Sequence, residues 1–335
     1  MSELLKKLSA HIRNKQNNDI RVVGYQALGE DGPVQLAAAE PKQSQAKLET
    51  SIDAVSVGSP KDGHFAYFMD GMERQRHILY CSRIPVVYGY VAASIRKRVD
   101  RRMKTHKSIS REALYCPSVL IETGMFAGAN LDIVPIDNED SPAEEHPMIL
   151  LDAARKRVSN IRNRLEYTIT SEWLDEFDGS DDWLLVDGSI TGDHHKYKIP
   201  NIVGAIKSHQ TNYFEGDDRR KILDLKEGER SGVFIPLGRN RPEVYSWYLR
   251  LRPSEGQDVH FGLIRVEAAK CARTLDMVDE ISRWIMAERS PLSLPDSRWD
   301  RMIYPIRDCE QYLKSLAPSM TMIEASIIGM GASLR

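Results

Sequence analysis

The stretch WLLVDGSITG, residues 183–192, runs an apolar segment directly into an aspartate, a glycine and a serine. A second stretch, FAYFMDGM at residues 65–72, has the same construction. Each apolar run predicts a buried strand, and the two strands end on Asp187 and Asp70. Asp-Gly is also an ordinary turn signal, so turn formation alone is the alternative for either pair. The other Asp-Gly pairs of the chain follow no such run, and this difference singles out Asp70 and Asp187.

A carboxylate at the end of a buried strand is costly unless a cation neutralises it. Mg²⁺ and Mn²⁺ prefer oxygen ligands. Carboxylates on neighbouring strand ends can hold two such ions about 4 Å apart, an arrangement that promotes attack on a phosphodiester. Asp70 and Asp187 are therefore predicted metal ligands, and the glycine after each one allows close approach of a phosphate.

A third carboxylate is expected from the helix that precedes Asp187. Glu166, beside the apolar stripe of that helix, is the first candidate, and Glu172 is the second. The alternative is an exposed helical glutamate, and for Glu166 the partner would be Arg162, four residues earlier on the same face.

Basic residues supply candidate contacts to a phosphate backbone. Lys207 ends the apolar run IVGAIKS and could reach a scissile phosphate, with a surface lysine as the alternative. The densest basic run of the chain, residues 96–107, could bind DNA, with a solvated helix face as the alternative. Its candidate residues are Arg96, Lys97, Arg98, Arg101, Arg102 and Lys104.

Composition narrows the class of protein. The chain has 335 residues, 41% apolar and 28% charged, which is typical of a globular protein. The formal net charge is −2, so a nucleic-acid site would have to be a local patch. The four cysteines form no CxxC pair and are expected to be free thiols. No signal peptide or span-length apolar run is present, which predicts a soluble, cytoplasmic protein without a membrane partner.

Other motifs carry little weight. His194 and His195 lack a third ligand at metal-site spacing, which favours loop histidines. Ser189 has no GxSxG elbow around it, which argues against a hydrolase nucleophile. The chain has neither GxxxxGK[ST] nor GxGxxG, so it does not resemble an ATPase or a dinucleotide-binding protein.

The pattern along the chain predicts an α/β fold with a mixed sheet flanked by helices. Helices are expected at residues 2–16, 148–174, 275–289 and around 307–316. Strands are expected at residues 64–70, 76–82, 84–95, 116–122, 129–136, 181–189, 199–208, 231–238, 244–253 and 260–269.

The order of short motifs resembles the NurA-type nucleases over about residues 60–316. In sequence order these motifs are FMDGM, RLE, LLVDGSITG, VGAIKS, SWYLRLRP, FGLIRVEA and MIYPIRDCEQYL. The resemblance implies an RNase H-like core, a Mn²⁺- or Mg²⁺-dependent site, a homodimer that threads DNA, and a HerA-type hexameric ATPase as partner. By position, Asp70, Glu166, Asp187 and Lys207 match the family's site residues, and Tyr304 with Pro305 matches its late Tyr-Pro.

The chain also departs from the family pattern. The first aspartate is followed by Gly-Met rather than Gly-Ser, and no histidine follows Tyr304. Asp308 is the residue that could take the place of that histidine as a last carboxylate. The predicted domains are an N-terminal helical and polar segment, a NurA-like nuclease domain with an insertion, and a C-terminal tail. Their bounds are 1–60, 61–320 with the insertion at 96–147, and 321–335.

These features predict a metal-dependent deoxyribonuclease that hydrolyses phosphodiesters in DNA end resection or in antiviral defence. One alternative is a non-catalytic, dimeric DNA-binding or adaptor subunit of the same ATPase complex. Another is a phosphoesterase or other metal enzyme that acts on small molecules.

Overall fold

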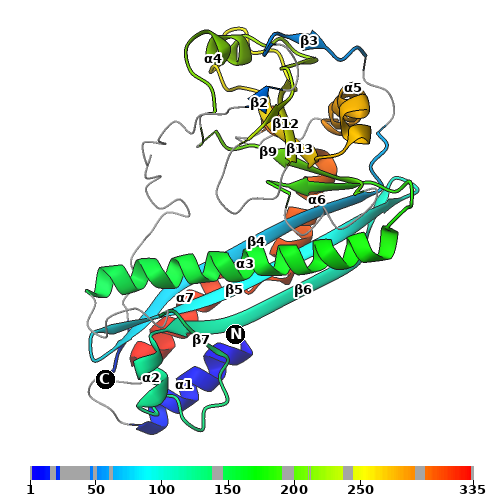
Figure 1. The fold of residues 1–335 in the computed structure, drawn as a ribbon. Helices are drawn as coiled ribbons and strands as arrows, with labels where there is room; N and C mark the ends of the chain where they lie inside the picture. The colour runs from blue at the N-terminus through cyan, green and yellow to red at the C-terminus, as the bar shows by residue number, and fades with distance from the viewer. Residues whose placement is uncertain are drawn as a thin grey trace.

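The computed structural model describes most of the chain and places its strands in one large sheet (Figure 1). It describes residues 2–15, 20–22, 46–47, 51–59, 63–137, 146–190, 200–209, 211, 213–236, 244–290 and 299–332. The helices of this part are α1 (Glu3–Lys15), α2 (Ser118–Glu122), α3 (Pro147–Phe177), α4 (Gly216–Leu223), α5 (Ala272–Glu288), α6 (Tyr304–Leu316), α7 (Met320–Ala332) and a 3₁₀ turn at Trp299–Arg301. The strands are β1 (Ile20–Val22), β2 (Ala46–Lys47), β3 (Val55–Ser56), β4 (Tyr67–Cys81), β5 (Ile84–Val99), β6 (Arg102–Cys116), β7 (Ile133–Pro135), β8 (Leu184–Asp187), β9 (Ile202–Ile206), β10 (Glu229–Arg230), β11 (Phe234–Ile235), β12 (Val244–Arg250) and β13 (Leu263–Ala269).

Five strands form the centre of the sheet, in the order β9-β8-β4-β5-β6. Strands β4, β5 and β6 form an antiparallel meander. The chain then crosses through α3 and returns in β8, which lies parallel to β4, and β9 lies parallel to β8. An antiparallel meander followed by two parallel strands on its first-strand side is the topology of an RNase H-like sheet. The predicted α/β class with an RNase H-like mixed sheet is therefore confirmed.

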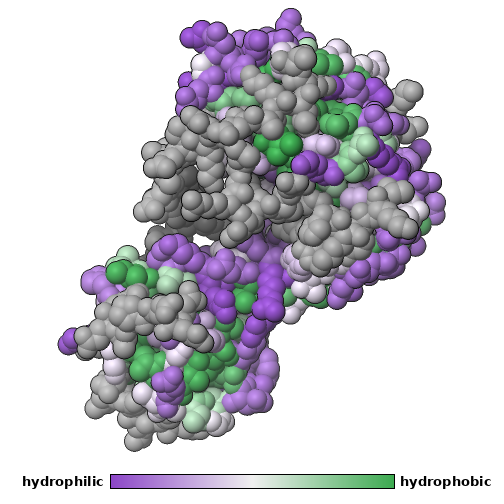
Figure 2. Space-filling view, in the orientation of Figure 1, coloured by the Kyte–Doolittle hydropathy of each residue, from purple (hydrophilic) through white to green (hydrophobic). Residues whose placement is uncertain are grey.

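The sheet continues beyond β9 into a second part of the molecule. Strand β13 pairs antiparallel with β9, and β12 pairs with β13. Figure 1 shows this part, with α4 and α5, above the long strands and α3. Figure 2 shows the molecule narrowing between the two parts, where most of the described surface in view is hydrophilic.

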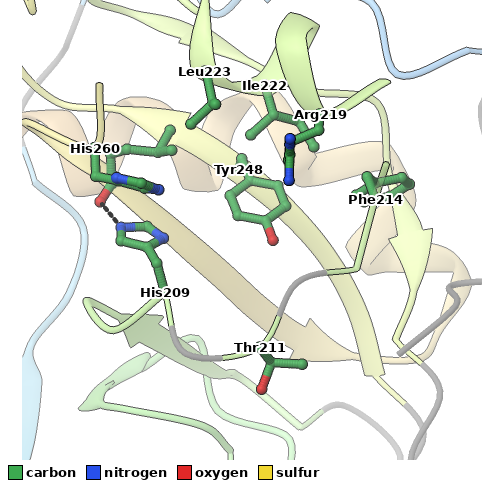
Figure 3. Close-up of a pocket in the computed structure, with 9 residues that line it drawn as sticks. His209, Thr211, Phe214, Arg219, Ile222, Leu223, Tyr248 and His260 are labelled. Atoms are coloured by element: carbon green, nitrogen blue, oxygen red, sulfur yellow. Dashed lines mark hydrogen bonds between the residues drawn. The ribbon is translucent and has the colours of Figure 1, made fainter. Parts of the chain in front are cut away.

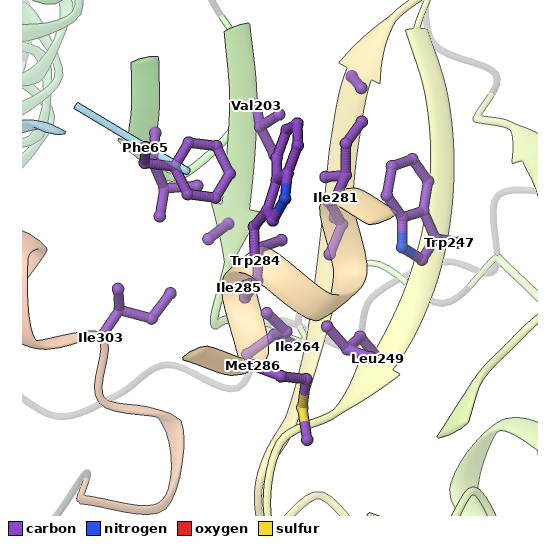
Figure 4. Close-up of a cluster of buried hydrophobic side chains, with 14 of the residues drawn as sticks. Phe65, Val203, Trp247, Leu249, Ile264, Ile281, Trp284, Ile285, Met286 and Ile303 are labelled. Atoms are coloured by element: carbon purple, nitrogen blue, oxygen red, sulfur yellow. The ribbon is translucent and has the colours of Figure 1, made fainter. Parts of the chain in front are cut away.

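Helices cover both faces of the centre. Along β4, Met69 packs with Trp173 of α3, whereas Phe68 packs with the cluster of α5 and α6. This alternation is the period of two that a strand imposes on its side chains. Figure 4 shows the second cluster, in which Trp284 of α5 packs among apolar side chains of the strands.

The two ends of the described chain meet at the far end of the meander. Buried side chains of α1 and α7 share one apolar cluster with β4, β5 and β6. The predicted C-terminal tail at residues 321–335 therefore contains helix α7 for most of its length. The domain boundaries drawn from the sequence stay a prediction.

Several sequence predictions need correction. The strands expected at 64–70 and 76–82 are one strand, β4, because its polar middle lies where β8 has ended and burial is incomplete. Residues 118–122 are helical rather than extended, and Pro117, which cannot donate to a sheet ladder, precedes them. Residues 96–99 and 102–116, within the range given to the predicted insertion, form the end of β5 and all of β6, and the division into domains stays a prediction.

Two further expectations can be checked within the described part of the chain. All four cysteines are free thiols, as the sequence predicted. None of the described helices combines the length and the apolar character needed to cross a bilayer.

Candidate functional site

Asp70 and Asp187 lie side by side on neighbouring parallel strands. Met69 of β4 is in register with Val186 of β8, so the next residue on each strand is the aspartate. Adjacent strands are about 4.8 Å apart, and alternation turns both carboxylates to the face that α5 and α6 cover. The convergence predicted from the two Asp-Gly motifs is therefore present in the fold.

Asp70 is the more deeply buried of the two, with 7% of its surface exposed. Burial raises the pKa of Asp70 well above its ordinary value, and the charge of Asp187 raises it further. The Lys207 ammonium and the Gly71 N–H, which donates to Asp70 Oδ1 at 2.8 Å, act in the opposite direction. The site thus holds carboxylates whose negative charges are incompletely compensated.

Lys207 is the cation nearest to these two carboxylates. Asp187 pairs with Ala205 of β9, and Lys207 follows two residues later on the same face. Its Nζ lies 2.8 Å from Asp187 Oδ1. The predicted phosphate-binding lysine therefore forms an ion pair with a site carboxylate.

Glu166 reaches the sheet from α3, directly over Gly71. A Cβ atom at Gly71 would stand 2.7 Å from the Glu166 carboxyl carbon and 2.9 Å from its Cγ, so only glycine leaves room for this side chain. Strand β8 ends at Asp187, and beyond this point the adjoining edge of β4 is open to Glu166.

The surroundings of Glu166 favour its protonated form. Burial raises its pKa to about 7, and the charges of Asp187 and Glu73 add to this effect. Arg162 acts against it, with Nε 3.4 Å from Glu166 Oε1. The arginine partner suggested by the i, i+4 spacing is present, and the glutamate side chain is only 14% exposed. Glu172, the second candidate, is an exposed partner of Lys107.

Helix α6 carries two more carboxylates, Asp308 and Glu310, which interact with different partners. Asp308 accepts a hydrogen bond from Arg96 Nε at 2.9 Å, which anchors α6 to β5. Glu310 raises the pKa of Asp70 through its charge and pairs with Lys314 at 2.8 Å. Glu310 was missed in the sequence, although its place beside the buried Cys309 on an amphipathic helix was a usable signal.

Two polar residues that the sequence did not predict lie next to the aspartates. Ser94 of β5 pairs with Asp70, is fully buried, and has no hydrogen-bond partner for its hydroxyl among the described residues. Glu267 of β13 accepts a hydrogen bond from the Ile190 N–H at 3.2 Å and so holds the turn after Asp187. The sequence gives no local signal for either, because both partners come from other strands.

The basic run at 96–107 is a β-hairpin, not a helix face. Arg98 makes two 2.7 Å contacts with the buried Glu288, Arg96 binds Asp308, and Lys97 lies over the ring of Tyr67. These three side chains hold the hairpin to the core. The exposed cations that remain, hereafter the hairpin tip, are Arg101, Arg102 and Lys104.

The other predicted residues lie apart from the carboxylates or outside the described chain. Tyr304 is the first residue of α6 and is 43% exposed. His194 and His195 fall outside the described residues.

The donor set fits a hard divalent cation by its chemistry. Asp70, Glu166 and Asp187 offer carboxylate oxygens, the pKa values of Asp70 and Glu166 are raised, and a cation would relieve the repulsion between the three charges. Within the described ranges, no group of three or more His, Cys, Asp or Glu side chains is already arranged around a metal position.

Comparisons with known proteins were made on the sequence and on the fold. No protein-family model and no curated protein matches the chain. Among solved structures, it is similar to the NurA nuclease from Sulfolobus solfataricus, with 14% identity, a TM-score of 0.46, and coverage of 83% of this chain and 86% of that one. It is also similar to the catalytic domain of human endonuclease V, with 12% identity, a TM-score of 0.32, and coverage of 94% and 99%. Both TM-scores are below 0.5, so neither likeness assigns an activity to this chain.

Proposed function

We propose that this chain is a divalent-metal-dependent deoxyribonuclease. The observation that carries the proposal is the register of β4 and β8, which sets Asp70 beside Asp187, with Glu166 packed on the glycine that follows Asp70. Three carboxylates at the open end of a strand are the donor type that Mg²⁺ and Mn²⁺ take in phosphodiester hydrolysis.

Each residue then has a definite task. Asp70, Asp187 and Glu166 would hold the cation, which would supply activation of water and neutralisation of phosphate charge. Lys207, which binds Asp187, is placed to bind a phosphate oxygen as a point charge. The hairpin tip would contact the DNA backbone.

The test is degradation of linear DNA by the purified chain with Mn²⁺ or Mg²⁺, with and without its ATPase partner. We expect Asp187→Ala and Glu166→Gln to lose at least about 100-fold in rate. Glu172→Gln is the matched control on the same helix, since Glu172 is exposed and binds Lys107, and it should keep full activity. Equal rates for wild type and Asp187→Ala, or no degradation by either, would refute the proposal.

One observation favours a second candidate, a non-catalytic DNA-binding or adaptor subunit. Lys207 already neutralises Asp187, and the carboxylates of the described residues are not arranged around a metal position. An intact dimer that binds DNA but degrades none with either cation would support this candidate over the nuclease.

The finer proposals come from the sequence resemblance alone. They are a homodimer that threads DNA, a HerA-type hexameric ATPase as the motor, and a role in DNA end processing or antiviral defence. Co-purification of the chain with such an ATPase, and its mass in solution, would test the first two.

A further inference from the structure

A cavity in the second part of the molecule lies outside the carboxylate site (Figure 3). Its volume is about 300 Å³, at the lower end of the range for small-molecule sites. The walls come from α4, β12, the segment after β9 and the segment before β13. In Figure 3 the polar side chains His209, His260, Tyr248 and Arg219 are gathered around one space with Thr211 at its side.

Two histidines in this wall present hydrogen-bond acceptors to the cavity. His209 Nε2 lies 3.0 Å from the Leu263 carbonyl, so Nε2 carries the proton and Nδ1 keeps its lone pair. Burial and the neighbouring His260 lower the pKa of His209 to about 4, which keeps the ring neutral. His260 Nδ1 lies 3.3 Å from Asp258 Oδ1, which leaves its Nε2 as the second acceptor.

A buried guanidinium holds the cavity wall in place from behind. Arg250 is fully buried, and it donates to the backbone carbonyls of Leu223, Val259 and Phe261. Leu223 lines the cavity, and His260, which also lines it, lies between the other two in the sequence. Burial lowers the pKa of Arg250, and the charges of nearby carboxylates, Asp258 among them, act in the opposite direction.

The lining of the cavity includes one arginine, Arg219, and two aromatic side chains, Tyr248 and Phe214. Arg219 of α4 is exposed and forms no ion pair with a described residue, in contrast to its neighbour Arg220, which binds Asp217 at 3.2 Å. Tyr248 and Phe214 supply ring faces, and Tyr248 also carries a hydroxyl. A ligand that uses every wall therefore has a flat aromatic part with N–H donors and an anionic part.

We propose that this cavity binds a single nucleotide unit, with its base among His209, His260 and the aromatic wall and its phosphate at Arg219. Nucleobases stack on aromatic side chains and offer amino groups to acceptors. A guanidinium is the group best suited to a phosphate. An inorganic phosphate alone would leave the rings and the two histidine acceptors unused, and an apolar ligand would make no use of Arg219. The unit could be a free mononucleotide or the terminal nucleotide of a DNA strand.

The test measures binding by calorimetry in EDTA, so that no hydrolysis occurs and the result is independent of the proposed nuclease activity. The probes are the four deoxynucleoside 5′-monophosphates, the corresponding deoxynucleosides, inorganic phosphate and a 5′-phosphorylated oligonucleotide. We expect at least one monophosphate or the oligonucleotide to bind, and Arg219→Ala to raise its Kd about tenfold through loss of a charge-assisted contact. Arg220→Ala, on the same helix but off the cavity, should leave Kd unchanged.

The probes separate the two sources and the opposing outcomes. Monophosphate binding that depends on Arg219 supports a free nucleotide, and binding of the oligonucleotide alone supports a strand end. Three results would overturn the proposal: no binding of any probe, inorganic phosphate binding as tightly as the monophosphates, or equal affinities for wild type and Arg219→Ala. Because Arg219 is exposed, its replacement does not threaten the fold.

Discussion

Gly71→Ala is the sharpest perturbation that the site offers. The new Cβ would stand 2.7 Å from the carboxyl carbon of Glu166, whereas carbon atoms in contact lie about 3.5–4.0 Å apart. The carboxyl group must therefore move by about 1 Å, which is the scale of misplacement that costs roughly 100-fold in rate. The backbone conformation at this position is compatible with alanine, because Gly71 does not adopt a positive φ. Stability should change by less than about 1 kcal/mol, since the obstacle is the end of a flexible side chain.

The assay compares DNA degradation and thermal unfolding of Gly71→Ala with those of Gly329→Ala. A Cβ at Gly329 meets nothing within 4 Å, so this variant should match the wild type in rate. Glu166→Asp withdraws the same carboxylate, so in the double variant the two losses should not add. A folded Gly71→Ala protein with the wild-type rate, or losses that add fully, would refute the role given to Glu166.

Three further predictions concern charge. Without divalent metal, the raised pKa of Glu166 stabilises the fold fully below its ordinary pKa near 4.5, and this stabilisation is lost as the pH rises towards about 7. Between these two pH values, the Tm of the wild type should therefore fall relative to that of Glu166→Gln. Parallel curves of Tm against pH for the two proteins would contradict this prediction. Arg98→Ala leaves the buried Glu288 unpaired, so the free energy of unfolding measured in urea should fall by about 3 kcal/mol. A fall of less than about 0.5 kcal/mol would contradict this prediction. Replacing all three residues of the hairpin tip with serine should weaken DNA binding. The slope of the logarithm of the binding constant against the logarithm of the salt concentration should become less steep by about one unit for each phosphate that the tip no longer neutralises. An unchanged slope would show that the tip does not contact DNA.

Local patterns were sufficient for the parts of the fold that depend on short-range order. The apolar run before Asp187 gave the end of β8, and the 3.6-residue stripe gave α3, which spans Pro147–Phe177. The strand end predicted at Asp70 was wrong, because β4 continues to Cys81; Asp70 lies beside Asp187 because β4 and β8 pair in parallel with Met69 opposite Val186. Glu166 was preferable to Glu172 because it lies beside that stripe, and its side chain is 14% exposed against 46% for Glu172.

The interaction partners of the basic residues could not be predicted from local patterns. Arg96 and Arg98 look alike in the sequence as candidates for DNA, yet their partners lie 212 and 190 residues further along the chain. The local sequence of a basic run does not show which of its side chains will form ion pairs with carboxylates far along the chain. The same limit applies to the cavity, since His209 and His260 meet only because β9 and β13 are neighbours in the sheet.

Strand β9 connects the carboxylate site with the cavity. It ends in a segment where Lys207 faces Asp187 and, two residues later, His209 enters the cavity wall. Alternate residues of an extended chain are about 6–7 Å apart, a span comparable to one nucleotide of a stretched single strand. Arg301 ties the two together, because it donates to the Lys207 carbonyl at 3.2 Å and its charge contributes to the low pKa of His209. Two residues therefore separate the lysine of the carboxylate site from a wall residue of the cavity, and a DNA strand whose last nucleotide lay in the cavity could extend from there toward Lys207.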